Sequence, residues 1–524
     1  MSTTITKTLD SLVQRGISHH LGNLQRGLEK ESLRVDPSGV LSQSPHPYAL
    51  GSTLTHPSIT TDYSESLLEF VTGVHSSTDS LLKELYDIHH FTYQYIGDQK
   101  LWVNSMLCIV ESEEKIPIAK YGNSNVAKMK EAYRRGLSHR YGSLMQTIAG
   151  IHFNFSMPET FWTDYYVGHR DTEIQQLRSA SYFNLIRNFH RNSWLGAYLF
   201  GASPAVCRSF LRGREHMLEN FDAHSFYAPN ATSLRLSGLG YSNEAQSNIE
   251  ICYNGVDLFV QSLRKAIQTP HPAYVELGVK KGGEYQQLNP NLLQIENEFY
   301  SSIRPKRIAD SGESPSRALG EQGVQYIEVR SIDLNPFEPI GIHADCVRFF
   351  DTFLLYCMFE DSPDMTQEEF MVTKENQKTM VMNGRDESTE IITPNGSVNS
   401  RAQMNVILGS MRPVAEMIDQ VNGTGDYVAT LEKQFNKVAD SNLTPSARII
   451  NQMLEEDLSF YDFSMRASEI SEQKFKKETI DSEIQAKYEN LARQSHLNQA
   501  EIEKNDSVSF DEFLEDYFER QNAT

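Results

Sequence analysis

The 524-residue sequence lacks the features that mark secreted and membrane proteins. Residues 1–16 contain no apolar signal segment, and the most apolar run, residues 194–207, is shorter than the ~20 residues of a membrane span. Cysteine is scarce and forms no CxxC pair; it occurs at Cys108, Cys207, Cys252, Cys346 and Cys357. This odd, scattered set predicts reduced thiols rather than a disulfide framework or a zinc ribbon. We therefore expect a cytoplasmic protein without a membrane span.

Positive charge is also in short supply. The chain has 48 Lys and Arg against 69 Asp and Glu, which gives a formal net charge of −21. This surplus repels polyphosphate and anionic lipid, which argues against nucleic acid or a membrane surface as the main partner. Hydrophobic residues make up 39% of the chain, enough for a large core. The sequence predicts a globular protein whose carboxylates can hold divalent cations.

The common nucleotide and hydrolase motifs are missing. No GxxxxGK[ST] loop is present, and no GxGxxG motif opens a helix after a strand. A GxSxG elbow and an HExxH pair are also absent, which excludes the simplest hydrolase sites. If the protein binds ATP, we expect a sheet, metal ions and arginines to bind it.

Three segments show the alternation of apolar and polar residues that is typical of half-buried strands. They are residues 23–36, 150–158 and 324–333. Because side chains alternate between the two faces of a strand, each segment places two polar groups side by side, about 6.5 Å apart. These pairs are Glu29 with Glu31, His152 with Asn154, and Glu328 with Arg330. Such faces are either exposed to solvent or form the floor of a site.

Other segments complete the predicted secondary structure. We expect helices over residues 78–95, with Thr78 as N-cap, and over residues 123–144. Residues 273–288 predict two strands around a Lys-Lys-Gly-Gly turn, and residues 292–300 predict another strand. Beyond about residue 360 the pattern becomes helical. We predict a catalytic α+β domain over residues 1–360 and a mostly helical C-terminal region, residues 361–524, packed on it.

The C-terminal stretch is acidic. Residues 501–524 contain eight acids and two bases. Within it, Phe510, Phe513, Leu514 and Phe518 follow a near-helical spacing, which predicts an amphipathic helix that docks on the body of the protein. The alternative is a solvated acidic cap.

Acidic residues also occur in apolar surroundings. Asp62, Glu65 and Glu69 lie close together, and Glu69 is flanked by Leu68 and Phe70. An unpaired carboxylate is costly in such a setting, and metal coordination would remove the cost. Mg²⁺ prefers oxygen ligands, including carboxylates and substrate phosphates. Salt bridges from Glu29 and Glu31 to nearby basic residues are the alternative.

Basic residues in regular segments offer partners for anions. Arg134, Arg235 and Arg304 are examples, and a planar guanidinium can pair with a carboxylate or phosphate through two hydrogen bonds. Tyr133 and Tyr241 lie close in sequence to two of these arginines and can wall a small pocket. Ordinary surface arginines and half-buried tyrosines are the alternative.

Taken together, the motifs resemble the proteobacterial glutamate–cysteine ligases. The resemblance runs from about residue 15 to residue 355 and rests on QRGLEKESLRV, GSTLTHPSITTDYSESLLEFVT, YGSLMQTIAGIHFNFS, LFGASPAVC, ATSLRLSGLGYSN, LQIENEFYSSIRPKR, SGESPSRAL and YIEVRSIDLNPFEPIG. It implies a glutamine-synthetase-like fold, in which a curved, mainly antiparallel sheet forms a funnel with helices outside.

The resemblance also implies site residues. Metal and nucleotide phosphates would be bound by Glu29, Glu31, Asp62, Glu69, His152 and Glu328, with Mg²⁺ as the ion and Mn²⁺ as its alternative. Arg330 falls near the transferred phosphoryl group, and Arg134 and Arg235 match positions for phosphate or a substrate carboxylate. The cysteine pocket matches Tyr133, Leu137, Arg235 and Tyr241, whereas Gln146 and Asn154 match glutamate contacts. Tyr63 stands where Phe is expected, and its hydroxyl bears on cysteine selectivity.

The implied reaction joins L-glutamate to L-cysteine at the expense of ATP, through γ-glutamyl phosphate, in the first step of glutathione biosynthesis. A related ligase with another acceptor amine is one alternative, and a non-catalytic relative that binds nucleotide and metal is another. The family further implies a monomer and feedback inhibition by glutathione.

Overall fold

A seven-stranded antiparallel sheet forms the centre of the computed structural model, which describes residues 3–211, 214–241, 246, 249–308 and 314–522. Six strands follow the order β11 (Ile303–Lys306), β12 (Tyr326–Ile332), β5 (Ile151–Ser156), β1 (Gln25–Val35), β3 (Leu67–Val71) and β2 (Ile59–Thr61), and β4 (Lys100–Leu101) pairs with the end of β1. The three segments with alternating polarity are therefore the adjacent strands β12, β5 and β1.

Helices cover one face of this sheet. α2 (Thr78–Tyr93) packs on β1 and β3, α5 (Asp171–Asn192) on β11, and α6 (Trp194–Phe200) on β12. α12 (Ala344–Phe359) lies against α5, and its Phe350 ring is 6.0 Å from that of Phe153 on β5. Ile151, Phe153 and Phe155 are fully buried on this side. The opposite face is left for the polar side chains, and the α+β prediction is confirmed.

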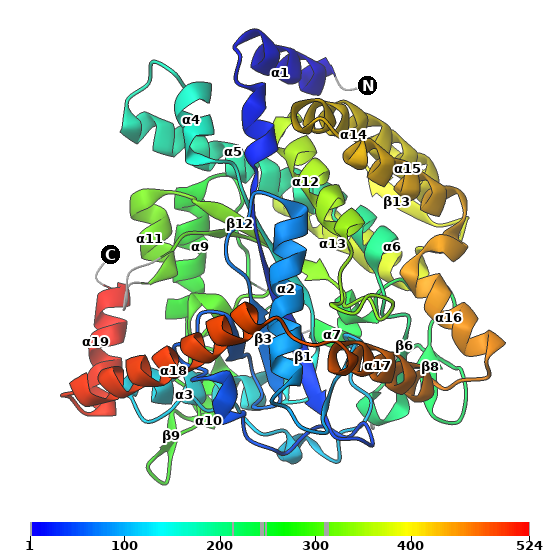
Figure 1. Cartoon of the computed structure of the whole chain (residues 1–524). Coiled ribbons are helices and arrows are strands. Elements are labelled where there is room, and N and C mark those ends of the chain that lie inside the picture. The colour runs from blue at the N-terminus through cyan, green and yellow to red at the C-terminus, as the bar shows by residue number, and fades with distance from the viewer. Residues whose placement is uncertain (1–2, 212–213, 242–245, 247–248, 309–313, 523–524) are drawn as a thin grey trace.

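The C-terminal third is helical, as predicted. It contains α13 (Gln367–Asn383), the hairpin β13–β14 (Glu390–Thr393 and Gly396–Asn399), α14 (Ser400–Asn422), α15 (Asp426–Ala439), α16 (Pro445–Glu455), α17 (Phe460–Lys477), α18 (Ser482–Asn505) and α19 (Phe510–Asn522). Figure 1 shows α14 and α15 beside α12, and α18 and α17 on either side of α2, joined by a loop that passes in front of it; both helices contact α2. One hydrophobic cluster extends from Ile5 to Tyr488, so α13 to α18 share the main core, whereas α19 packs in a separate small cluster.

The remaining elements surround the sheet. They are α1 (Thr3–Gln14), α3 (Asn125–Tyr141), α4 (Glu159–Tyr165), α7 (Gly238–Tyr241), α9 (Val256–Gln268), α10 (Pro272–Leu277), α11 (Pro315–Gln322), the sheet β6–β8–β7 (Ala205–Cys207, Ser225–Tyr227 and Glu219–Asn220) and the hairpin β9–β10 (Lys280–Lys281 and Glu284–Tyr285). Among the described residues, no helix has both the length and the apolarity needed to cross a membrane.

Two strand predictions were wrong. In residues 273–288 the hairpin exists, but each strand has only two residues and the first part is the helix α10. Pro272 begins this helix, and Gly278 ends it with a φ of 78°, a conformation that favours glycine. Residues 292–300 contain the short 3₁₀ helix η7 (Glu296–Glu298) in place of a strand.

The helix prediction for residues 78–95 needs a smaller correction. Ser77, not Thr78, is the N-cap of α2, because its side chain accepts a hydrogen bond from the backbone N–H of Ser80.

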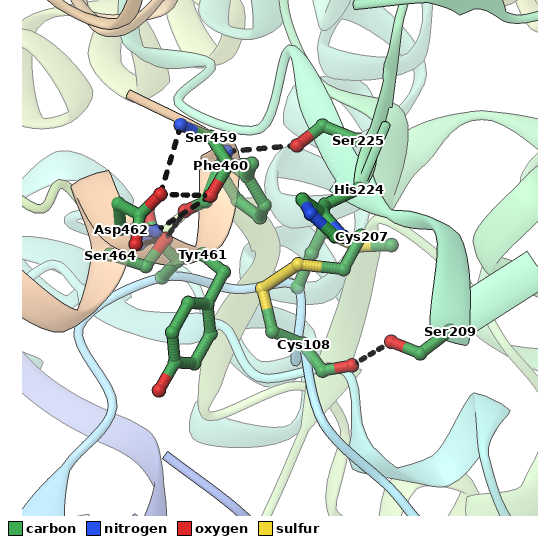
Figure 2. Close-up of a disulfide and its surroundings, with 12 residues drawn as sticks. Cys108, Cys207, Ser209, His224, Ser225, Ser459, Phe460, Tyr461, Asp462 and Ser464 are labelled. Carbon is green, nitrogen blue, oxygen red and sulfur yellow. Dashed lines mark hydrogen bonds between the residues drawn. A yellow bond between two sulfur atoms is a disulfide. The ribbon is translucent and has the colours of Figure 1, made fainter. Parts of the chain in front are cut away.

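The prediction of reduced thiols throughout was also wrong. Cys108 and Cys207 form a disulfide between residues 99 positions apart, while Cys252, Cys346 and Cys357 are free. Figure 2 shows the bridge between the loop that carries Cys108 and β6, with Ser209 donating a hydrogen bond to the carbonyl of Cys108. The fold brings these two residues together, and no local sequence pattern signals a pairing over such a distance.

Because the disulfide closes a long loop, it restricts the unfolded chain. In a buffer without reductant, replacement of Cys108 by Ala should lower the free energy of unfolding by about 2–5 kcal/mol. Denaturant unfolding followed by circular dichroism would measure this loss. Reductant should lower the midpoint of the natural protein to that of Cys108→Ala, whereas Cys252→Ala, which removes a free thiol, should still respond to reductant. A natural protein whose midpoint ignores reductant would contradict the expectation.

Candidate active site

Three adjacent strands bring together three potential metal ligands. Glu29 on β1 is opposite His152 on β5, and Glu328 on β12 is opposite Asn154 on β5. The carboxylate oxygens of Glu29 and Glu328 and a ring nitrogen of His152 all lie within 4.8 Å of one another. His152 Nδ1 is 3.1 Å from Glu29 Oε2. The antiparallel register therefore assembles a cluster that residues far apart in the sequence share.

The other three predicted metal ligands border this cluster. Glu31 is opposite Glu69 in the pairing of β1 with β3, and its Oε1 is 3.7 Å from His152 Nε2. Asp62 follows β2, and its Oδ1 is 3.9 Å from Arg134 Nη2. Asp62, Glu29 and Glu31 all act electrostatically on Glu69. The structure thus gathers all six predicted ligands in one region.

Electrostatic forces divide these carboxylates into two kinds. Burial, together with the charges of Asp62, Glu29 and Glu31, raises the pKa of Glu69 well above its usual value. Although burial also raises the pKa of Glu328, Lys306 and Arg330 outweigh it and hold this pKa well below its usual value. Lys306 Nζ is 3.2 Å from Glu328 Oε1, and Arg330 Nη1 is 3.0 Å from Glu328 Oε2.

This donor set fits a divalent cation. Carboxylate oxygens are the ligands that Mg²⁺ and Mn²⁺ prefer, and several of them converge here with one imidazole. The buried Oε1 of Glu328 accepts no hydrogen bond, and its one close partner is the Lys306 ammonium 3.2 Å away, so a cation there would share this oxygen with Lys306. A bound cation would also offset the repulsion that raises the pKa of Glu69.

A cavity of about 160 Å³ opens beside the acidic cluster. Glu31, Asp62 and Arg330 line one part of it, which joins it to the cluster. Five further predicted residues line it as well, namely Tyr63, Tyr133, Arg134, Leu137 and Gln146. α3 supplies Tyr133, Arg134 and Leu137, and also Tyr141. Positions 133 or 134, 137 and 141 are three or four residues apart, so they lie on one side of the helix.

Two of the predicted substrate-binding residues, Arg235 and Asn154, do not line this cavity. Arg235 is 2% exposed and lies behind Arg330, whose carbonyl accepts a hydrogen bond of 2.9 Å from its Nη2. Asn154 donates a hydrogen bond of 2.9 Å to Glu29 Oε1, so it supports a carboxylate of the cluster. Tyr241 is the last residue of α7, and its side chain lies outside the described part of the chain.

Arg235 reaches its place because residue 150 is glycine. A Cβ at Gly150 would lie 2.0 Å from Arg235 Nη2, which no real contact allows. The backbone N–H of Gly150 also donates a hydrogen bond of 2.7 Å to Glu31 Oε2. On its other side, Arg235 Nη1 is 3.6 Å from Oδ1 of the buried Asp333. Sequence reasoning found neither Gly150 nor Asp333.

The Tyr63 hydroxyl is turned to neighbouring serines. It donates a hydrogen bond of 2.8 Å to Ser143 Oγ, which is 2.7 Å from Ser138 Oγ. Tyr63 is only 1% exposed. Its hydroxyl is therefore satisfied by the protein, and the ring contributes to the cavity much as a phenylalanine ring would.

Several lining residues were missed at the sequence level, among them Tyr141, Gln246, Asn297 and Tyr300, whereas Arg304 was among the arginines expected to bind anions. Glu298 is the most informative of those missed. Its buried carboxylate accepts hydrogen bonds from Arg140 Nη1 at 3.0 Å, from the backbone N–H of Gln294 at 2.7 Å and from the Tyr141 hydroxyl. A glutamate beside Phe299 is the same signal that singled out Glu69.

A second cavity, of about 240 Å³, lies on the other side of Arg304, which lines both. Its polar wall includes Lys306 and Tyr326, next to Glu328 of the cluster. Its apolar wall is formed by Phe259, Leu263, Phe299, Pro305 and Leu319. The second cavity therefore adjoins the acidic cluster through Lys306, the ion-pair partner of Glu328.

Comparison with known proteins places this geometry in a family. The profile of the glutamate–cysteine ligase family matches residues 9–380. The chain belongs to this family. It is 46% identical to the glutamate–cysteine ligase of Alcanivorax borkumensis, over 98% of this chain and 99% of that protein. It is 47% identical to that of Pseudomonas putida KT2440, over 94% of each.

Solved structures agree with this assignment to the glutamate–cysteine ligases. A crystal structure of the Francisella tularensis glutamate–cysteine ligase in complex with AMP superposes with a TM-score of 0.90 at 34% identity, over 96% of this chain and 98% of that one. A bifunctional glutathione synthetase from Pasteurella multocida shares the fold, with a TM-score of 0.71 at 23% identity over 89% of this chain and 54% of that one.

The two kinds of carboxylate should have opposite effects on stability. Since the pKa of Glu69 is raised, the folded protein retains a proton that the unfolded chain loses, and stability falls as pH rises above the usual value of 4.5. In metal-free protein, Glu69→Gln should therefore raise the melting temperature at pH 7, and this increase should be smaller at pH 4. Differential scanning calorimetry in chelator would measure both.

Glu328→Gln is the matched control for this measurement. Because the pKa of Glu328 is lowered, its ionised form contributes stability above pH 4.5 that is lost as pH falls through the folded value. This substitution should lower the melting temperature at pH 7. If both variants shifted the melting temperature at pH 7 in the same direction, the opposite pKa shifts of Glu69 and Glu328 would be contradicted.

Proposed function

We propose that the protein is an ATP-dependent ligase that joins the γ-carboxylate of L-glutamate to the amine of L-cysteine, giving γ-glutamylcysteine, ADP and phosphate. The observation that carries this proposal is the cluster of Glu29, His152 and Glu328, with Arg330 at its edge, beside a cavity of amino-acid size in a glutamate–cysteine ligase chain. The reaction is the first step of glutathione biosynthesis.

The chemistry explains the need for such a site. A carboxylate is a poor electrophile because its charge repels nucleophiles. A γ-carboxylate oxygen of glutamate forms a bond to the γ-phosphorus of ATP, and the bond from that phosphorus to ADP breaks. The cysteine amine then forms the amide bond to the activated carbon, phosphate leaves, and the amine loses a proton. Both steps bring anionic oxygens together, so positioning and electrostatic stabilisation dominate the catalysis.

The acidic residues and the arginines have different roles in this reaction. Glu29, Glu31, Asp62, Glu69, His152 and Glu328 would hold Mg²⁺, or Mn²⁺ as the alternative. When bound, the ion neutralises phosphate oxygens and holds them in line for transfer. Arg330 stabilises the transferred phosphoryl group, and its ion pair with Glu328 fixes the direction of its guanidinium.

The two cavities suit the two kinds of substrate. The smaller one has tyrosines and arginines for amino acids, with Tyr133 and Leu137 as walls for cysteine and Gln146 as a contact for glutamate. Arg134 binds substrate carboxylate or phosphate, whereas Arg235 acts through Arg330 and Asn154 acts through Glu29. The larger cavity has an apolar wall for the base of ATP and Lys306 on the side of the cluster. The AMP complex of the Francisella relative supports a nucleotide site.

The orientation of Tyr63 favours cysteine over another acceptor amine. Its hydroxyl is bonded to Ser143, so it adds no free polar group to the pocket. We further propose that the protein is a cytoplasmic monomer, that glutathione inhibits it, and that residues 1–360 form the catalytic domain with residues 361–524 packed on it.

ADP release with glutamate, Mg²⁺ and a panel of amines tests the proposed activity. We expect strong preference for cysteine, and we expect Tyr63→Phe to keep the natural order of amines within about twofold because only a hydroxyl outside the pocket is lost. Faster turnover with 2-aminobutyrate or another amine would mean that this amine, and not cysteine, is the acceptor. Retained ATP binding without turnover would favour a non-catalytic relative.

The buried partner of Arg235 provides a second test. Asp333→Asn keeps the shape of a side chain that also accepts hydrogen bonds from Ser233 and Ala202 but removes its charge. We expect kcat/KM for glutamate to fall by roughly 10- to 100-fold, since small misplacements of a contacting group have effects of this size. Steady-state kinetics would measure it.

Asp351→Asn is the matched control. Asp351 forms an equally buried ion pair with Arg26, 2.8 Å away, on the helix-covered side of the sheet. This variant should lose stability and keep its kcat/KM once folded. If kcat/KM fell equally in both variants, the role of Asp333 would be structural only.

A further inference from the structure

The C-terminal helix α19 packs on the helix that lines the amino-acid cavity. Its apolar residues, predicted from their spacing, meet α3 and the segment of residues 285–295. Figure 1 shows α19 at the end of the long helix α18, which carries it away from the other C-terminal helices. The predicted docking on the body of the protein is therefore confirmed, and its location relative to the cavity raises the question of its role.

The docked helix belongs to a small hydrophobic cluster of its own. Only Leu514, Ala132 and Leu288 are buried in this cluster, among the described residues. Met129, Tyr133, Tyr285, Ile295, Phe510, Phe513 and Phe518 pack around them. The main core, by contrast, includes most of the buried hydrophobic residues of the chain. A cluster this small can open without unfolding the main core.

Tyr133 connects this cluster with the cavity. Within the described part of the chain, it is the one hydrophobic residue that packs against both the main core and the α19 cluster. It also lines the amino-acid cavity together with Arg134 and Leu137. A displacement of α19 therefore removes support from behind a side chain that forms the wall of the cavity.

Polar contacts fix α19 in a defined position. Asp511 accepts hydrogen bonds of 2.7 Å from Lys280 Nζ and from the Tyr285 hydroxyl on the β9–β10 hairpin. The chain leading into α19 is tied to the first turn of α3, because Asp506 Oδ2 accepts a hydrogen bond from the backbone N–H of Asn125 and the Val508 carbonyl accepts one from its side chain. These contacts give the helix one register on α3.

We propose that α19 positions the amino-acid pocket: its docking holds Tyr133 and the adjoining turns of α3 in the arrangement that binds the acceptor amino acid. This inference rests on the proposed function, since it takes the cavity to be the acceptor pocket. Undocking lowers the fraction of molecules with a formed pocket. The apparent affinity for the acceptor falls in proportion to that fraction, whereas chemistry in the formed pocket is unchanged.

Leu514→Ala in the full-length protein tests this role. Leu514 is the buried residue of α19, so its truncation weakens docking, and we expect hydrogen exchange of residues 510–522 to accelerate. The KM for cysteine should rise about fivefold or more, with kcat and the KM for ATP within about twofold of the natural values. Glu515→Ala, on the exposed face of the same helix, is the matched control and should change none of these.

Asp511→Asn provides a milder variant if Leu514→Ala aggregates. It loses the charge that holds Lys280, which should weaken docking while the apolar face stays intact. Faster exchange of α19 with an unchanged KM for cysteine would overturn the proposal. A common loss of kcat for all substrates, with a lower melting temperature, would also overturn it, since that outcome describes a purely structural helix.

The natural protein in the same assay separates this inference from the proposed function. If it turns over another amine in place of cysteine, the KM for that amine becomes the test, and the same shift is expected. If it turns over no amine, calorimetric titration with cysteine gives the affinity directly. Absence of both turnover and binding would reject the proposed function together with the inference, whereas normal turnover with an unshifted variant rejects the inference alone.

Discussion

The register of β1 between β5 and β3 is the constraint on which the candidate site depends. It sets Glu29 opposite His152 and Glu31 opposite Glu69, and all four side chains point to the same face of the sheet. A shift of one residue would move each of them to the face that α2 and α12 cover. The apolar residues that alternate with them, such as Leu28 and Phe153, are fully buried and fix the register. The hydrophobic core thus determines where the charges lie.

The charges in turn impose a cost that the fold only partly offsets. Lys306 and Arg330 form ion pairs with Glu328, whereas no Lys or Arg among the described residues forms one with Glu69, whose pKa is raised by burial and by its acidic neighbours. Such a local imbalance is common where a site is built for a charged ligand that completes it. Of the 69 Asp and Glu residues that give the net charge of −21, these few have a defined partner chemistry, and most of the others are not buried.

Sequence reasoning found the parts of the site that obey a local period. Two-residue alternation revealed β1, β5 and β12 and the faces of Glu29, His152 and Glu328, and helical spacing revealed α19. The family resemblance added Tyr63, Leu137 and Gln146, which no period marks. The failures have a common physical cause, because they depend on contacts between distant segments. The Cys108–Cys207 disulfide, the fit of Gly150 to Arg235 and the burial of Glu298 arise only when separate segments meet.

The order of the strands along the chain has a consequence for biosynthesis. β1 and β5 pair early, but β12, which covers the other edge of β5 and supplies Glu328, is synthesised only after residue 325. Until then β5 presents an open edge, with Phe153 and Phe155 lacking part of their packing. Exposed apolar edges of this kind favour aggregation, and pairing between distant strands is slow. The arrangement that gathers three ligands from three distant strands therefore leaves one edge of β5 unpaired in the nascent chain until β12 has been synthesised.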